Sequence, residues 1–189
     1  IRAAVLIERD KHAAAIDALT RVIALEPGRK SAYLQRAECR VAMEDLEGAI
    51  EDYGQALRLE PASAEIVNIH GNLRMRIKEY DAAISDFDEA IEQEPGCAAA
   101  YYNRGNAKYR KGDIDGARAD LKMALQLEPR FANAAFNLGL ALMALREYAD
   151  AVEVLSKTIE LNPRDPAAHM KRAEARFEAR PKDIASLRR

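Results

Sequence analysis

The sequence predicts an all-α solenoid built from stacked pairs of antiparallel helices, and three observations predict it. Prolines recur at intervals of 34 residues, at Pro27, Pro61, Pro95, Pro129 and Pro163. Alanines follow the same period, at Ala15, Ala49, Ala83, Ala117, Ala151 and Ala185. Hydrophobic residues make up 49% of the chain and charged residues 32%, a composition typical of a folded protein rather than a disordered one.

Each period contains the residue types that two packed helices need. Tiny residues lie twelve positions before five of the alanines, at Ala3, Ala37, Gly71, Gly105 and Gly139. Bulky residues follow the same alanines by four positions, at Leu19, Tyr53, Phe87, Leu121 and Leu155. Residues four apart share one helix face, and tiny residues let two backbones approach closely. Each proline then ends a second helix, because proline has no amide hydrogen and disfavours helix in the residue before it.

We therefore expect two helices in each repeat, with the first repeat truncated. The expected helices span residues 1–9, 12–25, 30–43, 46–59, 64–77, 80–93, 98–111, 114–127, 132–145, 148–161 and 166–179. Pro166 suits a helix start, where its missing amide hydrogen is not needed, and Pro181 separates the last helix from an Arg-rich end. The pairs must stack to bury their apolar faces, so we expect one domain over residues 1–189. Its repeats would span about 1–29, 30–63, 64–97, 98–131, 132–165 and 166–189.

The period and the residue types resemble the tetratricopeptide repeat (TPR) family over nearly the whole chain. Repeats three to five carry the family's Ala, Phe, Gly or Pro in register, at Ala83, Phe87, Pro95, Gly105, Ala117, Ala124, Pro129, Gly139, Ala151 and Pro163. The family's leucine before glycine is replaced by Arg36, His70 and Arg104 in three repeats. The resemblance implies a right-handed superhelix that binds other proteins and catalyses no reaction.

The resemblance also implies where a partner binds, because first helices line the concave groove of the family's superhelix. Groove positions of repeats three to five are Asn68, Asn72, Arg76, Tyr102, Asn103, Asn106, Tyr109, Arg110, Asn133, Phe136 and Asn137. Amide side chains both donate and accept hydrogen bonds, so they suit a peptide backbone of any sequence. The aromatic residues would form apolar pockets, and the arginines would take a carboxylate.

Some family members grip the carboxylate end of chaperone tails with a clamp of Lys, Asn, Asn, Lys and Arg. The equivalent positions here are Asn68, Asn72, Asn103, Asn133 and Asn137. Both asparagines of the clamp are kept, but all three basic residues are lost. The resemblance therefore argues against a chaperone-tail clamp of that kind.

Catalytic and metal-binding patterns do not occur in the sequence, so we expect a protein that is no enzyme and has no cofactor. The histidines, His12, His70 and His169, have no metal-ligand spacing, and neither HExxH nor a phosphate-binding glycine loop is found. Asp113 and Asp115 resemble the start of a calcium loop, but the rest of that pattern is wrong. Carboxylates of the second helices, including Glu51, Asp52, Asp86, Asp88, Glu89, Asp113 and Asp115, are interpreted as partners of the helix dipole.

Charge is distributed unevenly along the chain. Residues 1–163 carry 21 basic and 27 acidic residues, a net of −6, whereas residues 164–189 carry 8 basic and 4 acidic residues, a net of +4. The total of −2 predicts no general attraction to nucleic acid or anionic membranes. No apolar run approaches the roughly 18–20 residues of a membrane span. The basic end is interpreted as a solvated tail, with a docking site for an acidic partner as the alternative.

The compartment and the assembly state stay open. Cys39 and Cys97 do not form a disulfide framework, which is compatible with any compartment. We favour the cytoplasm, and a periplasmic or secreted protein stays open because the chain begins with Ile1 rather than Met. Two alternatives to a simple protein-binding module remain: a scaffold that assembles with copies of itself through its end repeats, and the interaction domain of a larger enzyme.

Overall fold

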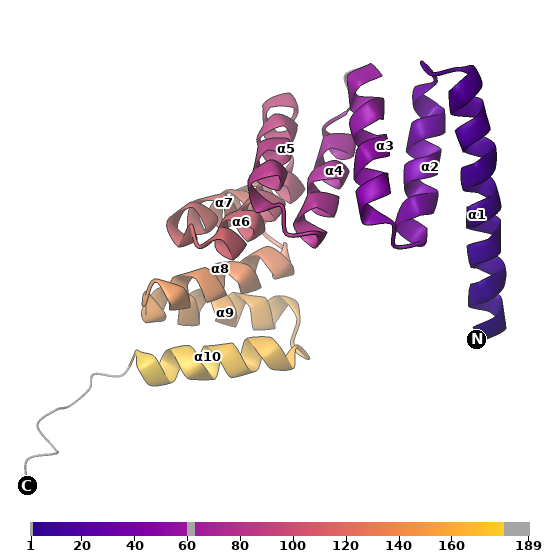
Figure 1. Cartoon of the computed structure of the whole chain (residues 1–189). Coiled ribbons are helices and arrows are strands. Elements are labelled where there is room, and N and C mark those ends of the chain that lie inside the picture. The colour runs from indigo at the N-terminus through magenta and orange to yellow at the C-terminus, as the bar shows by residue number, and fades with distance from the viewer. Residues whose placement is uncertain (1, 60–62, 180–189) are drawn as a thin grey trace, which may run out of the picture. The chain divides into compact units, whose positions relative to one another are not determined.

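The computed structural model describes residues 2–59 and 63–179, with side chains described from residue 11 onward. These residues form ten helices and no strand, which confirms the all-α fold class (Figure 1). The helices are α1 (Arg2–Leu25), α2 (Lys30–Ala42), α3 (Leu46–Leu59), α4 (Ala64–Arg76), α5 (Tyr80–Gln93), α6 (Ala98–Lys111), α7 (Ile114–Leu127), α8 (Ala132–Ala144), α9 (Tyr148–Leu161) and α10 (Pro166–Glu178). From α2 onward, each starts and ends within two residues of its predicted bounds.

Two compact units divide the chain, and each is described by itself. Unit 1 comprises residues 1–95 with α1 to α5, and unit 2 comprises residues 96–189 with α6 to α10. Within each unit, every helix packs against the next one along the chain. In unit 2, α8 also contacts both α6 and α10, so these three helices lie next to one another. The first helices of successive pairs therefore share a face of unit 2.

Tiny residues allow the two helices of a pair to cross closely, as the sequence predicts. A methyl group added at Gly71 would lie 2.7 Å from Phe87 Cε1, and one added at Gly139 would lie 2.6 Å from Leu155. Both bulky side chains are fully buried, at 0% exposure. Such distances are shorter than van der Waals contact, so a methyl group at either position would force the facing side chain to move.

The turn between the helices of a pair contains one residue in the left-handed conformation. These residues are again 34 positions apart: Glu44 (φ 65°), Lys78 (φ 66°), Gly112 (φ 96°) and Arg146 (φ 63°). A residue with a side chain pays about 1–2 kcal/mol for this conformation, whereas glycine adopts it without steric strain.

The prediction for the first repeat is wrong. The sequence predicts helices over 1–9 and 12–25, but α1 is one continuous helix from Arg2 to Leu25. The position equivalent to the left-handed turn residues is Asp10, which lies inside this helix. Residues 2–14 contain neither Gly nor Pro and are mostly good helix formers, so the local sequence does not end the helix there.

Candidate functional site

The predicted groove residues fall in both units. Asn68, Asn72 and Arg76 lie on α4 of unit 1, where the two asparagines are half-buried and Arg76 is exposed. The other eight lie on α6 and α8 of unit 2: Tyr102, Asn103, Asn106, Tyr109, Arg110, Asn133, Phe136 and Asn137. Because α6 contacts α8, the structure brings members of this second set together.

A hydrogen-bonded group joins α6 to α8. The side-chain amide of Asn137 donates from Nδ2 to Asn106 Oδ1 at 2.7 Å, and the same nitrogen lies 3.4 Å from the Tyr102 hydroxyl oxygen. All three residues are half-buried. Among the described residues, Asn137 Oδ1 and Asn106 Nδ2 have no hydrogen-bond partner. The group therefore still offers one amide acceptor and one amide donor.

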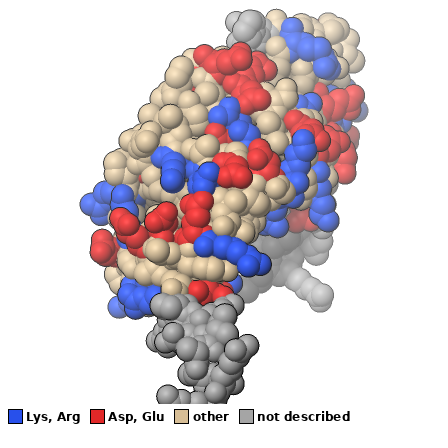
Figure 2. Space-filling model, turned by 90° about the vertical axis from the view of Figure 1, so that its left-hand side faces the viewer, with Lys and Arg blue, Asp and Glu red and all other residues tan. Residues whose placement is uncertain are grey.

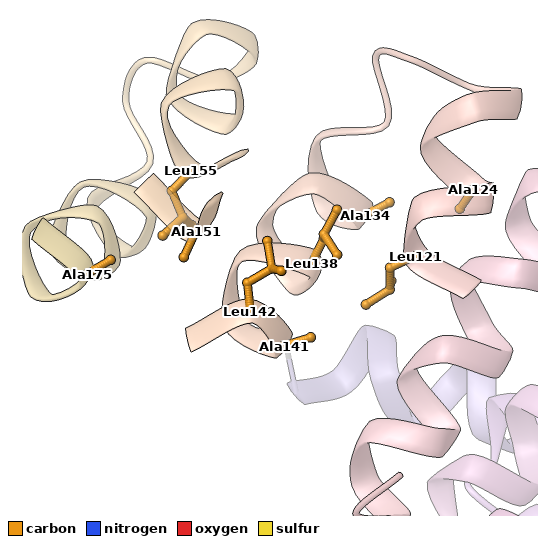
Figure 3. Packing of buried hydrophobic residues seen from close by; sticks show 9 residues of the cluster. All are labelled: Leu121, Ala124, Ala134, Leu138, Ala141, Leu142, Ala151, Leu155 and Ala175. Carbon is orange, nitrogen blue, oxygen red and sulfur yellow. The ribbon is translucent and has the colours of Figure 1, made fainter. Parts of the chain in front are cut away.

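Apolar side chains on α6, on α8 and at the start of α8 accompany this amide group. The ring of Tyr102 packs on that of Phe131, with centroids 4.7 Å apart and ring planes 40° apart. Tyr109 and Phe136 are half-buried against the buried cluster of unit 2. Figure 3 shows the centre of that cluster, where leucines of α8 lie between Leu121 and Leu155. Asn133 and Arg110 are exposed. The face thus combines an anchored amide pair with partly exposed aromatic rings.

Three buried carboxylates, Asp52, Asp86 and Asp120, lie one period apart in the second helices, and the dipole interpretation is wrong for Asp52 and Asp86. Asp52 is 1% exposed, Asp86 is 7% exposed and Asp120 is 4% exposed. Each lies in the middle of its helix rather than in the first turn, where the helix dipole acts. A buried charge is costly unless it is paired, so each aspartate needs cations nearby.

Two basic side chains of the preceding helix contact each carboxylate. They lie 16 and 12 positions before the aspartate in the sequence. Arg36 donates to both oxygens of Asp52, at 2.9 and 2.6 Å, and Arg40 adds an ion pair at 3.0 Å. The hydrogen bonds to Asp52 raise the pKa of Arg36. The equivalent groups are His70 and Arg74 around Asp86, and Arg104 and Lys108 around Asp120. The residues that replace the family's leucine, Arg36, His70 and Arg104, are thus the first basic residue of each group.

The three carboxylates are not equally well bonded. Arg104 reaches both oxygens of Asp120, at 2.9 and 2.6 Å, as Arg36 does at Asp52. At Asp86, His70 Nδ1 lies 3.0 Å from Oδ2, within ion-pair distance, but neither atom has a hydrogen bond of good geometry. The other ring nitrogen of His70 lies 3.2 Å from the Ile50 carbonyl oxygen. Asp86 therefore has the least complete set of partners.

The next pair, α8 and α9, lacks this charged group altogether. The equivalent positions hold Leu138, Leu142 and Val154. The two leucines are 3% and 1% exposed and belong to the buried cluster of unit 2 (Figure 3). One chain therefore packs the same kind of helix pair with two different chemistries.

Neither a metal centre nor a membrane-spanning segment is found in the part of the chain that the structure describes. No group of three or more His, Cys, Asp or Glu side chains there could hold a metal ion, and no helix there is long and apolar enough to cross a membrane. Asp113 instead caps α7, accepting a hydrogen bond from the Gly116 amide at 2.9 Å. Basic and acidic side chains intermingle on the face seen in Figure 2.

Neither the two cysteines nor the residues that line an open hollow of unit 2 belong to the amide group. Cys39 and Cys97 are free, and burial raises the pKa of Cys39. A hollow of about 360 Å³ lies between the start of α9 and the end of α10 and is lined by Arg146, Glu147, Tyr148, Ala149, Asp150, Glu178 and Ala179. It is open to solvent and includes none of the predicted groove residues.

Comparison with protein families identifies the repeat. The model of the tetratricopeptide repeat matches in five overlapping stretches, at residues 2–64, 40–92, 70–135, 102–166 and 136–182. The chain belongs to the tetratricopeptide repeat family. TPR proteins are in general non-catalytic scaffolds for protein–protein interaction. No curated protein sequence matches the chain.

Solved structures of TPR proteins share the fold. YrrB, described as a TPR protein with an unusual peptide-binding site, has a TM-score of 0.76 and 20% identity, over 93% of this chain and 88% of that one. MamA from Desulfovibrio magneticus RS-1 has a TM-score of 0.75 and 20% identity, over 87% and 94%. The first TPR of Spaghetti (RPAP3), bound to the HSP90 peptide SRMEEVD, has a TM-score of 0.60 and 23% identity, over 61% and 91%. At these identities the likeness establishes the fold alone.

Proposed function

We propose that this chain is a non-catalytic interaction module whose TPR domain, residues 1–189 in about five and a half repeats, binds an extended segment of a partner protein. In unit 2 the segment lies along α6 and α8. The observation that carries the proposal is the hydrogen-bonded group of Asn137, Asn106 and Tyr102. It fixes two amide side chains in place and leaves an acceptor and a donor for a ligand.

The chemistry of this face suits a peptide backbone. Asn137 Oδ1 accepts from a peptide N–H, and Asn106 Nδ2 donates to a peptide carbonyl. Because the two asparagines already bond each other, little side-chain freedom is lost when a peptide binds. Side chains of the peptide pack on Tyr109 and Phe136, which supply apolar contact area without fixing one sequence.

The remaining predicted residues extend the same role. Arg110 and Asn133 are exposed, so both are accessible to a ligand on unit 2, where Arg110 suits an acidic side chain. Asn68, Asn72 and Arg76 on α4 present a similar set in unit 1. Peptide binding by YrrB and by the first TPR of Spaghetti supports a peptide as the class of ligand.

The test selects 15-residue peptides against the full chain from a random display library and measures their affinity by fluorescence anisotropy. Asn106→Ala and Asn137→Ala should each weaken binding by about tenfold or more, because each leaves a buried polar group of the complex unpaired. Asn103→Ala with Asn137→Ala should weaken it further.

The matched control is Asn162→Ala, which removes an exposed asparagine at the end of α9. It should leave affinity unchanged, and circular dichroism should show intact helices in every variant. A library that yields no peptide, or peptides that bind the asparagine variants as tightly as the parent, would contradict the proposal.

A further inference from the structure

A row of hydrogen-bond donors runs along α6. Tyr102, Asn106 and Arg110 are four residues apart in the sequence, so they follow one side of the helix at intervals of about 6 Å along its axis. The equivalent row of α8 is apolar and consists of Phe136, Leu140 and Ala144. Because α6 contacts α8, a polar row and an apolar row belong to neighbouring helices of unit 2.

Each residue of the polar row keeps a donor that no described residue uses. The hydroxyl oxygen of Tyr102 and Oδ1 of Asn106 both accept from Asn137 Nδ2. The hydroxyl hydrogen of Tyr102 and the Nδ2 hydrogens of Asn106 are therefore left for a ligand. Arg110 is exposed, and no hydrogen bond or ion pair joins it to any residue that the structure describes. Such a row favours a ligand that is rich in acceptors.

The charges of the two helices favour an acidic ligand. Neither α6 nor α8 contains a carboxylate, and α8 contains no charged residue at all. Of the basic residues of α6, Arg104 and Lys108 are paired with the buried Asp120, whereas Arg110 has no such partner among the described residues. A negatively charged group of a ligand therefore meets an unpaired cation here and no repelling anion on either helix.

The length of the polar row matches an extended peptide. Tyr102 and Arg110 are eight residues apart on α6, which is about 12 Å along the helix axis. Four residues of an extended chain span about 13 Å, and every second side chain points to the same edge. Acceptor side chains four residues apart in a ligand can therefore reach both ends of the row. The residues that alternate with them point to the other edge, toward Phe136 and Leu140 of α8.

We propose, resting on the function proposed above, that the segment bound by unit 2 alternates acidic and apolar residues. Its pattern is acid-Φ-x-Φ-acid, where Φ is a large apolar residue. One carboxylate binds Arg110, the other accepts from the Tyr102 hydroxyl, and Asn106 and Asn137 bind the backbone between them. The two apolar side chains pack on α8. Both acids are internal side chains, so the ligand needs no terminal carboxylate.

The probes are two libraries of 15-residue segments, displayed within a carrier protein so that neither end is free. One library fixes Glu-Leu-x-Leu-Glu at its centre, the other fixes Gln-Leu-x-Leu-Gln, and all other positions are random. We expect the full chain to enrich segments of the Glu library. The best segment is then synthesised with acetylated and amidated ends, and its affinity is measured by fluorescence anisotropy. Its Gln counterpart should bind about tenfold or more weakly, because a charge-assisted bond to Arg110 is lost.

Charge reversal in the protein tests the same contact. Arg110→Glu should weaken the Glu peptide about tenfold or more, and this variant should prefer a peptide with Lys in place of one Glu. The matched control is Arg164→Glu, which reverses the charge of an exposed arginine of unit 2 outside α6 and α8 and should bind like the parent. Circular dichroism should show intact helices in both variants.

Equal affinity for the Glu and Gln peptides, or an unchanged affinity of the Arg110→Glu variant for the Glu peptide, would overturn the proposal. So would a Glu library without binders, or binding that requires a free terminal carboxylate. Asn106→Ala separates the two proposals. If it weakens the Glu and Gln peptides alike while the parent binds both equally, the face binds extended segments without a preference for acids. If it weakens neither, the proposed function itself has failed.

Discussion

The two complete helix pairs of unit 2 pack in the same way with different chemistry. In α6–α7 the crossing contains Arg104, Lys108 and the buried Asp120, whereas in α8–α9 the equivalent residues are Leu138, Leu142 and Val154. Both pairs place a glycine against a buried leucine, Gly105 on Leu121 and Gly139 on Leu155. The tiny and bulky residues therefore specify the crossing, and the charges are an optional addition to it.

The largest expected effect comes from breaking the charged group while leaving its anion. Arg104→Leu with Lys108→Leu keeps Asp120 buried at 4% exposure but removes both cations. We expect the free energy of unfolding to fall by about 3–5 kcal/mol, the usual result when a buried charge loses its partners. Urea denaturation followed by circular dichroism measures this.

Adding Asp120→Val to this double variant gives α6–α7 the same three apolar residue types as α8–α9. We expect the triple variant to regain the lost stability. Replacing a buried ion pair by hydrophobic residues is often neutral or stabilising by about 1–4 kcal/mol. A triple variant that stays as unstable as the double variant would show that the charges themselves specify this pair, and the comparison would fail.

A larger residue in place of the buried alanine at the crossing should lower stability equally in both pairs. Ala117 and Ala151 are each 0% exposed at equivalent places. Ala117→Leu and Ala151→Leu should each lower stability by about 1–3 kcal/mol through overpacking. Thermal unfolding of the two variants measures the loss, and a neutral result for either one would contradict the shared register.

The smallest expected effect lies in the interhelix turns. Arg146 has a left-handed φ of 63°, whereas α6–α7 has Gly112 at φ 96° in the same place. Arg146→Gly should raise stability by about 0.5–1 kcal/mol, because the relief of strain exceeds the added freedom of the unfolded chain. Gly112→Ala should lower it by about 1 kcal/mol. The two changes are compared in parallel urea titrations, and a destabilised Arg146→Gly variant would contradict the strain argument.

The sequence predicts most of the helices and crossings because they depend on local periodicity. It fails at α1, where the turn depends on one left-handed residue and Asp10 carries no signal that distinguishes it from a helical residue. The sequence contains a signal for the buried ion pairs, since aspartates 34 apart follow basic residues by 16 and 12 positions. That signal is recognised only when Arg36 and Arg104, which replace the family's leucine, are considered together with Asp52 and Asp120.

The candidate site is predictable only as a set of positions. The period places Asn106 and Asn137 on adjacent first helices, but their mutual hydrogen bond depends on side-chain rotamers that no periodicity specifies. The apolar chemistry of α8 matters here too, because Asn133 and Asn137 are the only polar side chains on a helix that carries no charged residue.

The most direct test of the functional account is the NMR signals of the asparagine side-chain amides during titration with a selected peptide. We expect the NH₂ signals of Asn106 to move, because its unpaired amide gains an acceptor, and those of Asn137 to move with them. The signals of Asn162 should stay fixed. A peptide that binds by anisotropy while the Asn106 and Asn137 signals remain unchanged would contradict the assignment of this face as the binding site.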